Sequence, residues 1–239
     1  SSDMTENTYS GNINLTKQFG DVQVKIGGLY EDKTRDFDAR NLGYVRSSSN
    51  DFDYTLIENS ITNLFNSINK TGIKIDEQTN PSDSYKSNNK LAAAYVTTLI
   101  PINNKLAFNA GVRFENNIQD LKSALIGGEP INLNYPITKV LPSANINYTF
   151  SSKTVLKSSY GQTLNRPEFR ELAPFAYYDF DYNYVYKGSP LRTAIVQNLD
   201  TRLEHYPSPN EVISFAVFYK HFTDPIESLV VPGAGSGGA

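Results

Sequence analysis

The sequence predicts an all-β protein of about eight antiparallel strands arranged in four hairpins. The first observation is that apolar and polar residues alternate with a period of two, which is the pattern of a strand with one apolar face. The second is that short and long connections alternate along the chain. Tight turns at Gly20-Asp21, Asn103-Asn104, Ser151-Ser152 and residues 207–210 join hairpin partners, and long polar segments join successive hairpins.

Each strand is recognised by residues that share one face. Residues 91–100 are apolar on both faces, and another strand runs from Ser159 to Arg166-Pro167, where proline cannot donate to a sheet ladder. The alternating apolar faces are, in chain order: Ile13 and Leu15; Val22, Val24, Ile26 and Tyr30; Leu106, Phe108, Ala110, Val112 and Phe114; Ala144, Ile146, Tyr148 and Phe150; Leu199 and Leu203; Ile213, Phe215, Val217 and Tyr219.

Four polar segments are predicted as long loops, at about residues 40–88, 119–136, 166–192 and from 223 onward. Within residues 51–75, apolar residues recur at helical spacing, which predicts a short amphipathic helix inside the first loop. Long loops at one end and tight turns at the other are typical of outer-membrane barrels. The alternation itself fits a soluble β-sandwich equally well, so it leaves both architectures open.

Composition and motif content exclude several functions. The 239 residues carry a net charge of −3, no cysteine and no basic block, so we expect no nucleic-acid partner and no disulfide framework. The sequence contains no run of about 18 apolar residues, so no membrane-spanning helix is predicted. Metal-binding, nucleotide-binding and hydrolase motifs are absent, so we expect no catalytic residue, no metal, no cofactor and no enzymatic activity. The chain starts at Ser1 without an initiator Met or signal peptide, so we expect further sequence upstream.

Two groups of residues are candidate binding positions. Tyrosine offers rigid, flat contact area and a hydroxyl, so a tyrosine-rich stretch is a candidate ligand site, although these residues also suit packing at a barrel rim. These ligand-binding candidates are Tyr177, Tyr178, Phe180, Tyr182, Tyr184 and Tyr186. Polar strand faces line a wet lumen or contact a plug in a large barrel, but are simply solvated on an open soluble sheet. The lumen- or plug-facing candidates are Arg113, Glu115, Asp200, Arg202, Glu204 and Lys220.

A long motif extends over residues 159–175, which read SYGQTLNRPEFRELAPF. Its strand, followed by Arg-Pro-x-Phe-Arg-Glu-Leu and Ala-Pro-Phe, resembles the barrel of TonB-dependent outer-membrane receptors, in the branch common in Bacteroidetes. Residues 110–115, 140–148, 199–207 and 218–227 resemble further stretches of the same family in the same order. The family-motif positions are Arg166, Pro167, Phe169, Arg170 and Glu171.

The resemblance implies an antiparallel transmembrane β-barrel segment, about eight strands of a larger barrel of roughly 22 strands. Residues 1–239 would form a partial outer-membrane barrel domain with extracellular long loops, without the plug domain and the barrel-closing strands. The resemblance also implies an outer-membrane location in a Gram-negative bacterium and contact with outer-membrane lipid. The resemblance further implies that energy for transport would come from the TonB complex, through a plug region outside this sequence.

The implied function is active uptake of a scarce nutrient, with a small-molecule or glycan substrate such as a ferric chelate, haem, cobalamin or an oligosaccharide. The residues themselves leave two alternatives. One is a soluble β-sandwich that binds carbohydrate or mediates adhesion, and the other is a small structural outer-membrane barrel.

Overall fold

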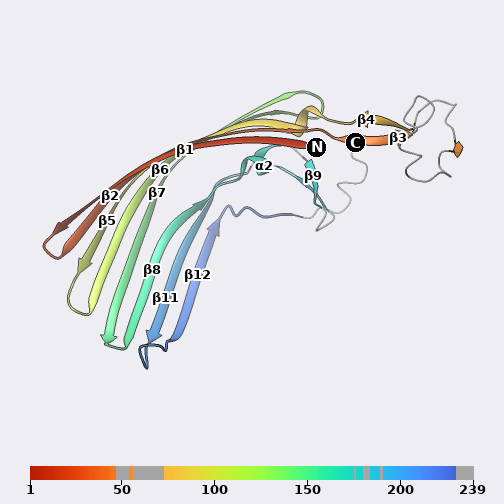
Figure 1. Ribbon diagram of the computed structural model, residues 1–239. Helices are drawn as coiled ribbons and strands as arrows, with labels where there is room; N and C mark the ends of the chain where they lie inside the picture. Colours follow the sequence, from red (N-terminus) through yellow and green to blue (C-terminus); the bar gives the residue numbers. More distant parts are fainter. Residues whose placement is uncertain (47–53, 56–72, 175, 180–183, 189–190, 230–239) are drawn as a thin grey trace.

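A computed structural model describes residues 1–46, 54–55, 73–174, 176–179, 184–188 and 191–229. Its main element is one eight-stranded antiparallel sheet in the order β1-β2-β5-β6-β7-β8-β11-β12, so each strand pairs with its sequence neighbours in the sheet (Figure 1). The strands are β1 (Ser2–Phe19), β2 (Val22–Ala39), β5 (Ser84–Pro101), β6 (Leu106–Ala124), β7 (Pro130–Ser151), β8 (Thr154–Asn165), β11 (Ala194–His205) and β12 (Ile213–Thr223). The eight strands expected from the alternation are confirmed.

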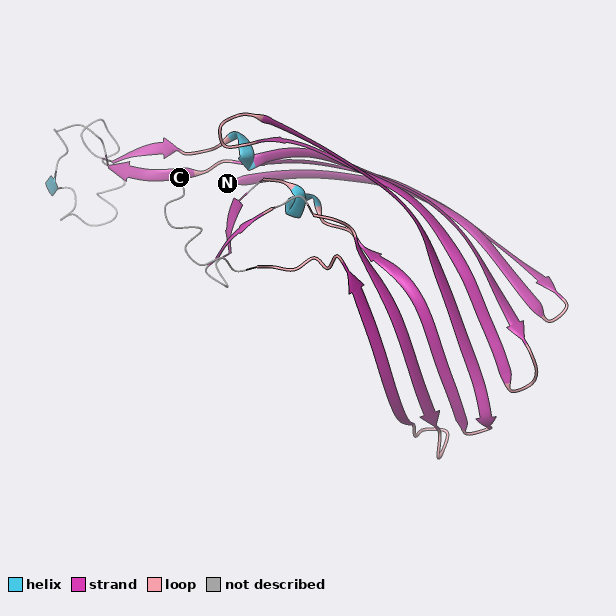
Figure 2. Ribbon diagram, turned by 180° about the vertical axis from the view of Figure 1, so that it is seen from behind, coloured by secondary structure: helices cyan, strands magenta, loops and turns pink. Residues whose placement is uncertain are grey.

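The sheet is curved and open. Figures 1 and 2 show the strands bending around a hollow, and β1 and β12 form the two edges. The described strands therefore do not close into a self-contained eight-stranded barrel. The other described sheets have two strands each, so no second large sheet covers the first, and the β-sandwich alternative is wrong.

Short turns lie at one end of the sheet and, apart from residues 125–129 between β6 and β7, longer connections lie at the other (Figure 1). All four predicted tight turns are confirmed. The predicted loop over residues 119–136 is wrong, because β6 continues to Ala124 and β7 begins at Pro130, so that only residues 125–129 turn. On β7, Ile131, Leu133 and Tyr135 alternate with asparagines and share the inward face with Leu121 of β6, so the strand pattern and the hydrogen-bonded ladder both continue through this region.

Two small hairpins form within the longer connections. β3 (Leu42–Arg46) pairs with β4 (Ile73–Glu77), which is followed by the 3₁₀ turn η2 (Pro81–Asp83), and β9 (Ala176–Asp179) pairs with β10 (Tyr184–Lys187). Neither hairpin was expected from the sequence. The amphipathic helix predicted within residues 51–75 lies mostly outside the described residues, and residues 73–75 belong to β4.

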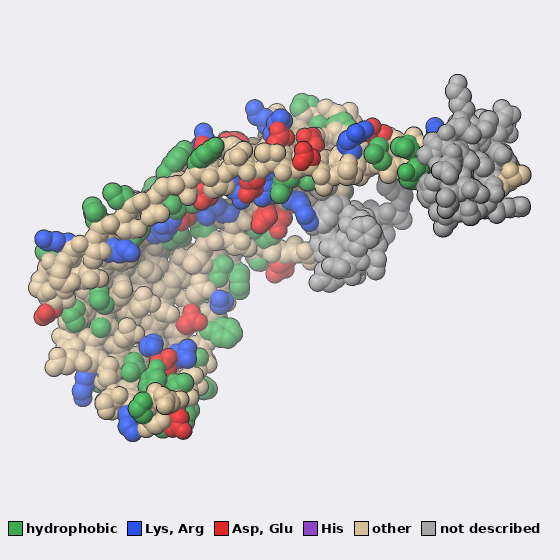
Figure 3. Space-filling model, in the orientation of Figure 1, with side chains coloured by type: hydrophobic (Ala, Val, Ile, Leu, Met, Phe, Trp, Pro, Cys, Tyr) green, Lys and Arg blue, Asp and Glu red, His purple; other side chains and the backbone are tan. Residues whose placement is uncertain are grey.

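One face of the sheet carries a continuous band of apolar side chains, called here the apolar belt. Directly opposed residues in an antiparallel pair point to the same face, so the strand register carries the predicted apolar face of β6 across all eight strands. The belt comprises Ile13, Leu15, Val24, Ile26, Val96, Ile100, Phe108, Val112, Phe114, Val140, Ile146, Tyr148, Leu156, Tyr160, Leu199, Leu203, Phe215, Val217 and Tyr219. Many of these side chains are exposed, with Phe215 at 69 %. Figure 3 shows apolar side chains standing out along the convex side of the sheet.

The height of the belt fits a lipid bilayer. On β6 it extends from Leu106 to Phe114, which is about 26 Å along the strand at a rise of about 3.3 Å per residue. At a strand tilt of about 40° this corresponds to about 20 Å along the membrane normal, close to the roughly 25 Å of barrel proteins. β7 has 22 residues, whereas spanning requires about 9–11, so the strand continues beyond the belt toward the longer connections.

At the level of the belt, the opposite face of the sheet is mostly polar and lines the hollow. It carries residues such as Asn109, Asn145 and Ser159, which are opposed to one another across β6, β7 and β8. No helix in the described residues is long and apolar enough to cross a membrane.

Candidate functional site

Directly after β8 the chain folds back into the hollow of the sheet. β8 ends at Asn165, and Pro167, which has no N–H, stops the ladder as predicted. Residues 166–173, called here the inner segment, cross the concave face and include the single helical turn α2 (Phe169–Leu172). Figures 1 and 2 show α2 inside the hollow. All five residues singled out in the family-like motif therefore lie in the inner segment and not in the barrel wall.

Charged and polar side chains anchor the start of the inner segment on β6. Arg166 forms an ion pair with Glu115, and Arg113 Nε donates to the other carboxylate oxygen of Glu115 at 2.5 Å. Gln119 donates through Nε2 to the carbonyl oxygen of Pro167 at 3.0 Å. Glu115 is only 7 % exposed, so two guanidinium groups compensate a carboxylate that has lost most of its water. Glu115, a predicted lumen residue, thus holds the motif arginine, and Arg113, another, bonds the same carboxylate.

Apolar side chains anchor the rest of the inner segment. Phe169, Leu172 and Ala173 are buried, and they form the main hydrophobic cluster of the described chain with three residues of the wall. These wall residues are Ala39, Tyr85 and Leu121, from β2, β5 and β6. A motif predicted as loop from the sequence is therefore a packed element, held by burial as well as by charge.

Arg35 on β2 connects this cluster to further charges. Its guanidinium lies 5.4 Å from the centre of the Phe169 ring, a cation–π distance, and it bonds Glu6 on β1 at 2.6 Å. Lys33 reaches the same carboxylate at 3.3 Å. Figure 3 shows charged side chains of both signs gathered in the hollow, near the position of α2 in Figure 1. The inner segment therefore connects β1, β2, β5 and β6 on their concave side.

The inner segment leads into the hairpin of β9 and β10, which contains the tyrosine-rich stretch. The register opposes Tyr177 to Tyr186, Tyr178 to Val185 and Asp179 to Tyr184. The hairpin thus brings the predicted tyrosines Tyr177, Tyr178, Tyr184 and Tyr186 together, whereas Phe180 and Tyr182 lie outside the described residues. Their role in ligand binding stays a prediction.

Gly188, directly after β10, allows the end of this hairpin to approach the inner segment closely. A Cβ at Gly188 would collide with the carbonyl oxygen of Ala173 and would lie 2.8 Å from that of Glu171. Only a residue without a side chain fits this close approach to the inner segment. The base of the tyrosine hairpin is therefore packed on the backbone of the anchored motif.

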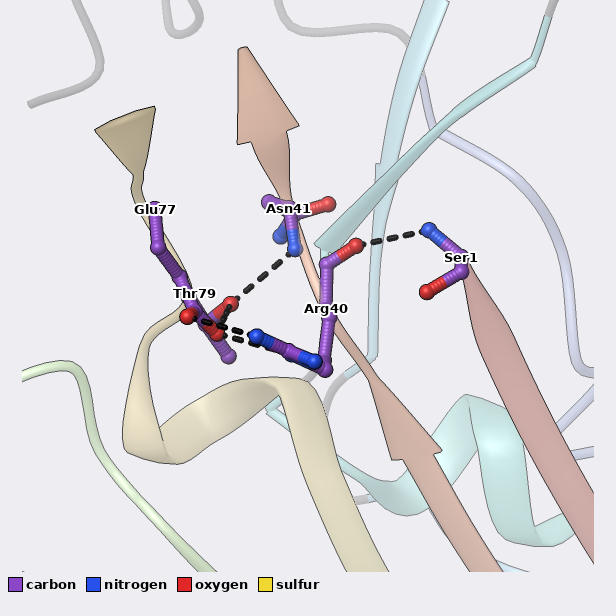
Figure 4. A network of polar contacts seen from close by, with 5 residues as sticks. All are labelled: Ser1, Arg40, Asn41, Glu77 and Thr79. Carbon is purple, nitrogen blue, oxygen red and sulfur yellow. Dashed lines mark hydrogen bonds and ion pairs between the residues drawn. The ribbon is translucent and has the colours of Figure 1, made fainter. Parts of the chain in front are cut away.

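The other hairpin, β3–β4, is joined at its base by a polar network (Figure 4). Arg40 donates to both carboxylate oxygens of Glu77, at 3.0 and 2.8 Å, and Thr79 donates to Glu77 at 2.9 Å. The Arg40 guanidinium holds the pKa of Glu77 at about 2, and the Thr79 hydroxyl assists. The backbone N–H of Asn41 donates to the Thr79 hydroxyl at 3.0 Å, so both strands of the hairpin are tied where they leave the wall.

The remaining predicted lumen residues lie on the same face as Arg113 but form a separate cluster. On β11, Glu204 accepts from Lys157 at 2.8 Å and from Tyr206 at 2.8 Å, and Arg202 lies 3.1 Å from its other oxygen. Asp200 on β11 and Lys220 on β12 occupy the same polar face by register. Contact of any of these residues with a plug stays a prediction.

Several residues of the site were not predicted. Arg35, Tyr85 and Leu121 had no local signal, because their partner Phe169 is far away in sequence, and Gln119 fell in a segment predicted as loop. Their only sequence signal is their alternate positions on strands. In the described part of the chain, no group of three or more His, Cys, Asp or Glu residues could hold a metal ion.

Comparison with known proteins identifies the class. The model of the outer membrane protein beta-barrel family matches residues 51–234, which is well over half of the chain, so the chain belongs to this family. Its sheet is a segment of a transmembrane β-barrel in the bacterial outer membrane, and the apolar belt is the surface that faces lipid. No curated protein matches the chain.

Solved structures share the fold at low sequence identity. The ferric yersiniabactin uptake receptor FyuA from Yersinia pestis is 11 % identical with a TM-score of 0.55, over 94 % of this chain and 30 % of that one. The closed form of the ferric-catecholate import receptor Fiu from E. coli K12 is 13 % identical with a TM-score of 0.54, over 92 % and 32 %. The copper transporter OprC is 11 % identical with a TM-score of 0.57, over 91 % and 30 %. The chain therefore spans about a third of the length of these proteins.

Proposed function

We propose that this chain forms part of the wall and ligand entrance of a TonB-dependent receptor that takes up a scarce nutrient across the outer membrane. The substrate would be a ferric chelate, haem, cobalamin or an oligosaccharide, and energy would come from the TonB complex through a plug domain. Proteins of similar structure include receptors for uptake of ferric yersiniabactin and import of ferric catecholates, and a copper transporter. The proposal assigns binding and transport to the chain, and no catalysis.

The observation that carries the proposal is the inner segment. It anchors a tyrosine-rich hairpin at the end of the sheet that has the longer connections, next to a polar hollow. Binding residues concentrate on loops that a rigid scaffold positions. A structural barrel requires no such inward anchor, so a ligand entrance explains it better than the structural-barrel alternative.

The test is an uptake experiment with the full-length receptor in Gram-negative cells. Radiolabelled ferric siderophores, haem, cobalamin and oligosaccharides are offered separately, with TonB present or deleted. We expect one class to accumulate, and only when TonB is present. Accumulation that is equal without TonB, or no accumulation of any class by a correctly inserted receptor, would contradict the proposal.

The tyrosine hairpin gives a second, residue-level test. Replacement of both Tyr177 and Tyr186, which oppose one another, by Ala should raise the ligand concentration for half-maximal uptake at least about tenfold, because buried aromatic contacts at hot spots cost above about 1 kcal/mol each. Tyr44 on the β3–β4 hairpin, replaced by Ala, serves as control. Lower receptor abundance with unchanged affinity would assign the tyrosines to packing.

A further inference from the structure

The wall is not continuous between β7 and β8. β7 pairs with all of β6, as far as Ala124 opposite Pro130. With β8 it pairs only from the short turn up to Ser143 opposite Gly161, although β7 itself extends to Pro130. Figures 1 and 2 show β8, β11 and β12 diverging from β7 beyond this point. The gap, called here the seam, divides the outer part of the sheet into two leaves, one of β1, β2, β5, β6 and β7 and one of β8, β11 and β12.

A proline ends the ladder between β7 and β8. Alternate residues of a strand direct their backbone N–H and C=O groups to opposite neighbours. The N–H of Thr149 donates to the carbonyl of Lys105, directly before β6, at 2.7 Å, so odd-numbered residues of β7 bond β6 and even-numbered residues face β8. The next pair in the β7–β8 register would be Pro142 with Gln162, and Pro142 has no N–H to donate.

Two further prolines interrupt the rest of this edge. Pro130 and Pro136 also occupy even positions of β7, so they remove N–H donors from the same free edge. β8 ends at Asn165, and continuing the register would place Pro136 opposite a residue beyond that end. The seam begins level with Val112, which lies opposite Pro142 near the upper limit of the apolar belt. The sequence of β7 therefore specifies both the existence of the seam and its height.

The inner segment bridges the seam on the concave side. It starts directly after β8 and passes behind β7 to reach Glu115 and Gln119 of β6. Beyond these contacts, Phe169 and the hydrophobic cluster tie it to β2, β5 and β6. The inner segment thus joins the two leaves at the height where the ladder between them is missing.

The charged end of the inner segment is incompletely paired. Asn117 lies between Glu115 and Gln119 on the inward row of β6 and is fully buried. Its Oδ1 atom and the Nε atom of Arg166 are buried without a hydrogen-bond partner among the described residues. A buried polar atom left unpaired weakens the contact that buries it. This cost is relieved when the charged end leaves the wall, whereas the apolar end carries no such cost.

We propose that the seam is an opening built into the wall, and that the inner segment is the strap that holds it closed. When Arg166 leaves Glu115, the leaf of β8, β11 and β12 swings away from β7 about the last paired residues, Ser143 and Gly161. The apolar end of the strap stays attached, so the opening is reversible. That the wider entrance admits the nutrient rests on the proposed function, but the opening itself does not.

The test measures the width of the seam with pairs of spin labels on the full-length receptor in lipid nanodiscs. Labels at Asn134→Cys and Gln197→Cys, both exposed, span the seam, whereas labels at Asn134→Cys and Lys90→Cys lie within one leaf. The strap variant Arg166→Ala, Phe169→Ala should lengthen the mean distance across the seam by at least about 5 Å, one strand spacing. The distance within the leaf should stay unchanged.

A matched pair of proline substitutions tests the cause of the seam. Pro142→Val restores the donor opposite Gln162, so adding it to the strap variant should return the distance across the seam to that of the unaltered receptor. Pro136→Val makes the same change beyond the end of β8 and should not restore it.

Three results would overturn the proposal. One is an unchanged distance across the seam in a strap variant whose heat-dependent gel mobility shows a folded barrel. Another is an equal lengthening of both distances, which would indicate general loosening of the wall. The third is equal rescue by the two proline substitutions. If the strap variant does not fold, Pro142→Val alone decides, because it should narrow the spread of distances across the seam, and an unchanged spread would refute the seam. None of these measurements uses a nutrient, so their failure is distinct from failure of the uptake experiment.

Discussion

Ile146 offers a direct test of which face of the sheet meets lipid. It lies near the middle of the apolar belt on β7, opposite Phe108 on β6 and Ser158 on β8, and it is 43 % exposed. Its sequence neighbour Asn145 is at nearly the same depth but on the polar face, opposite Asn109. Substituting arginine at each position therefore places the same charge on either side of one strand.

The expected difference follows from depth and burial. Arginine facing lipid near the bilayer midplane costs about 2–4 kcal/mol. Ile146 also loses apolar contacts over the covered part of its side chain, which adds about 1 kcal/mol. Asn145→Arg points into water and should cost less than about 1 kcal/mol. We therefore expect Ile146→Arg to be less stable than Asn145→Arg by at least about 2 kcal/mol.

The assay is reversible folding of the full-length receptor into lipid vesicles during a urea titration, with heat-dependent gel mobility as the signal. Unfolding free energies of the two variants are compared with that of the unaltered protein. Equal costs for the two substitutions, or a larger cost for Asn145→Arg, would show that the lipid-facing and hollow-facing sides have been assigned incorrectly.

Three further changes test how the connections are held. Glu115→Gln removes the charge that pairs with Arg166 and should cost about 1.5–3 kcal/mol locally, so protease should cut the inner segment at least about tenfold faster. Gly188→Ala forces a methyl group against two carbonyl oxygens of that segment, so it should expose the β9–β10 hairpin to protease while global stability is kept. Acid should open the base of the β3–β4 hairpin, because the pKa of Glu77 is about 2 there against an ordinary 4.5. The ion pair then stabilises fully above about pH 4.5 and is lost as the pH falls toward 2, so hydrogen-exchange protection of β4 should fall over that range.

Each of these changes has a matched control. Glu129→Gln, in an exposed turn, should leave cleavage unchanged, and similar cleavage in Glu115→Gln would argue against the anchoring role of that carboxylate. Gly127→Ala meets no atom within 4 Å, so an effect equal to that of Gly188→Ala would point to a general effect of the methyl group. Glu77→Gln should remove the pH dependence of β4 protection, and a pH dependence that persists would assign it to another group.

The strands of the wall could be predicted because lipid and water impose opposite demands on alternate residues. Phe108 and Asn109 differ in polarity for this reason, and the register confirms the faces predicted for β6 and β7. Tight turns such as Gly20-Asp21 were also predictable, since Gly20 adopts a positive φ of 59° that favours glycine. These features depend on local sequence alone.

The extensions and the site could not be predicted in the same way. Beyond the belt the outward face of β6 is mostly polar, and the inward face includes buried polar residues such as Asn117, so Asn116 and Asn117 resemble loop in the sequence although both are paired on β6. The inner segment is held by contacts with residues about 50 to 130 positions away, such as those of Arg166 with Glu115 and of Phe169 with Arg35, and no local pattern encodes them. The motif could be recognised as family-like, but its inward fold could be found only from the structure.

Labelling of single cysteines on whole cells tests the central claim, that the polar hollow opens outward at the end with the longer connections. The chain contains no cysteine, and Glu129 and Ser152 are exposed in turns at opposite ends of the sheet. The full-length receptor with Glu129→Cys should react with a membrane-impermeant thiol reagent on intact cells, whereas Ser152→Cys should react only after the outer membrane is broken. Labelling of Ser152→Cys alone on intact cells would contradict the orientation, and labelling of both would contradict the membrane-spanning wall.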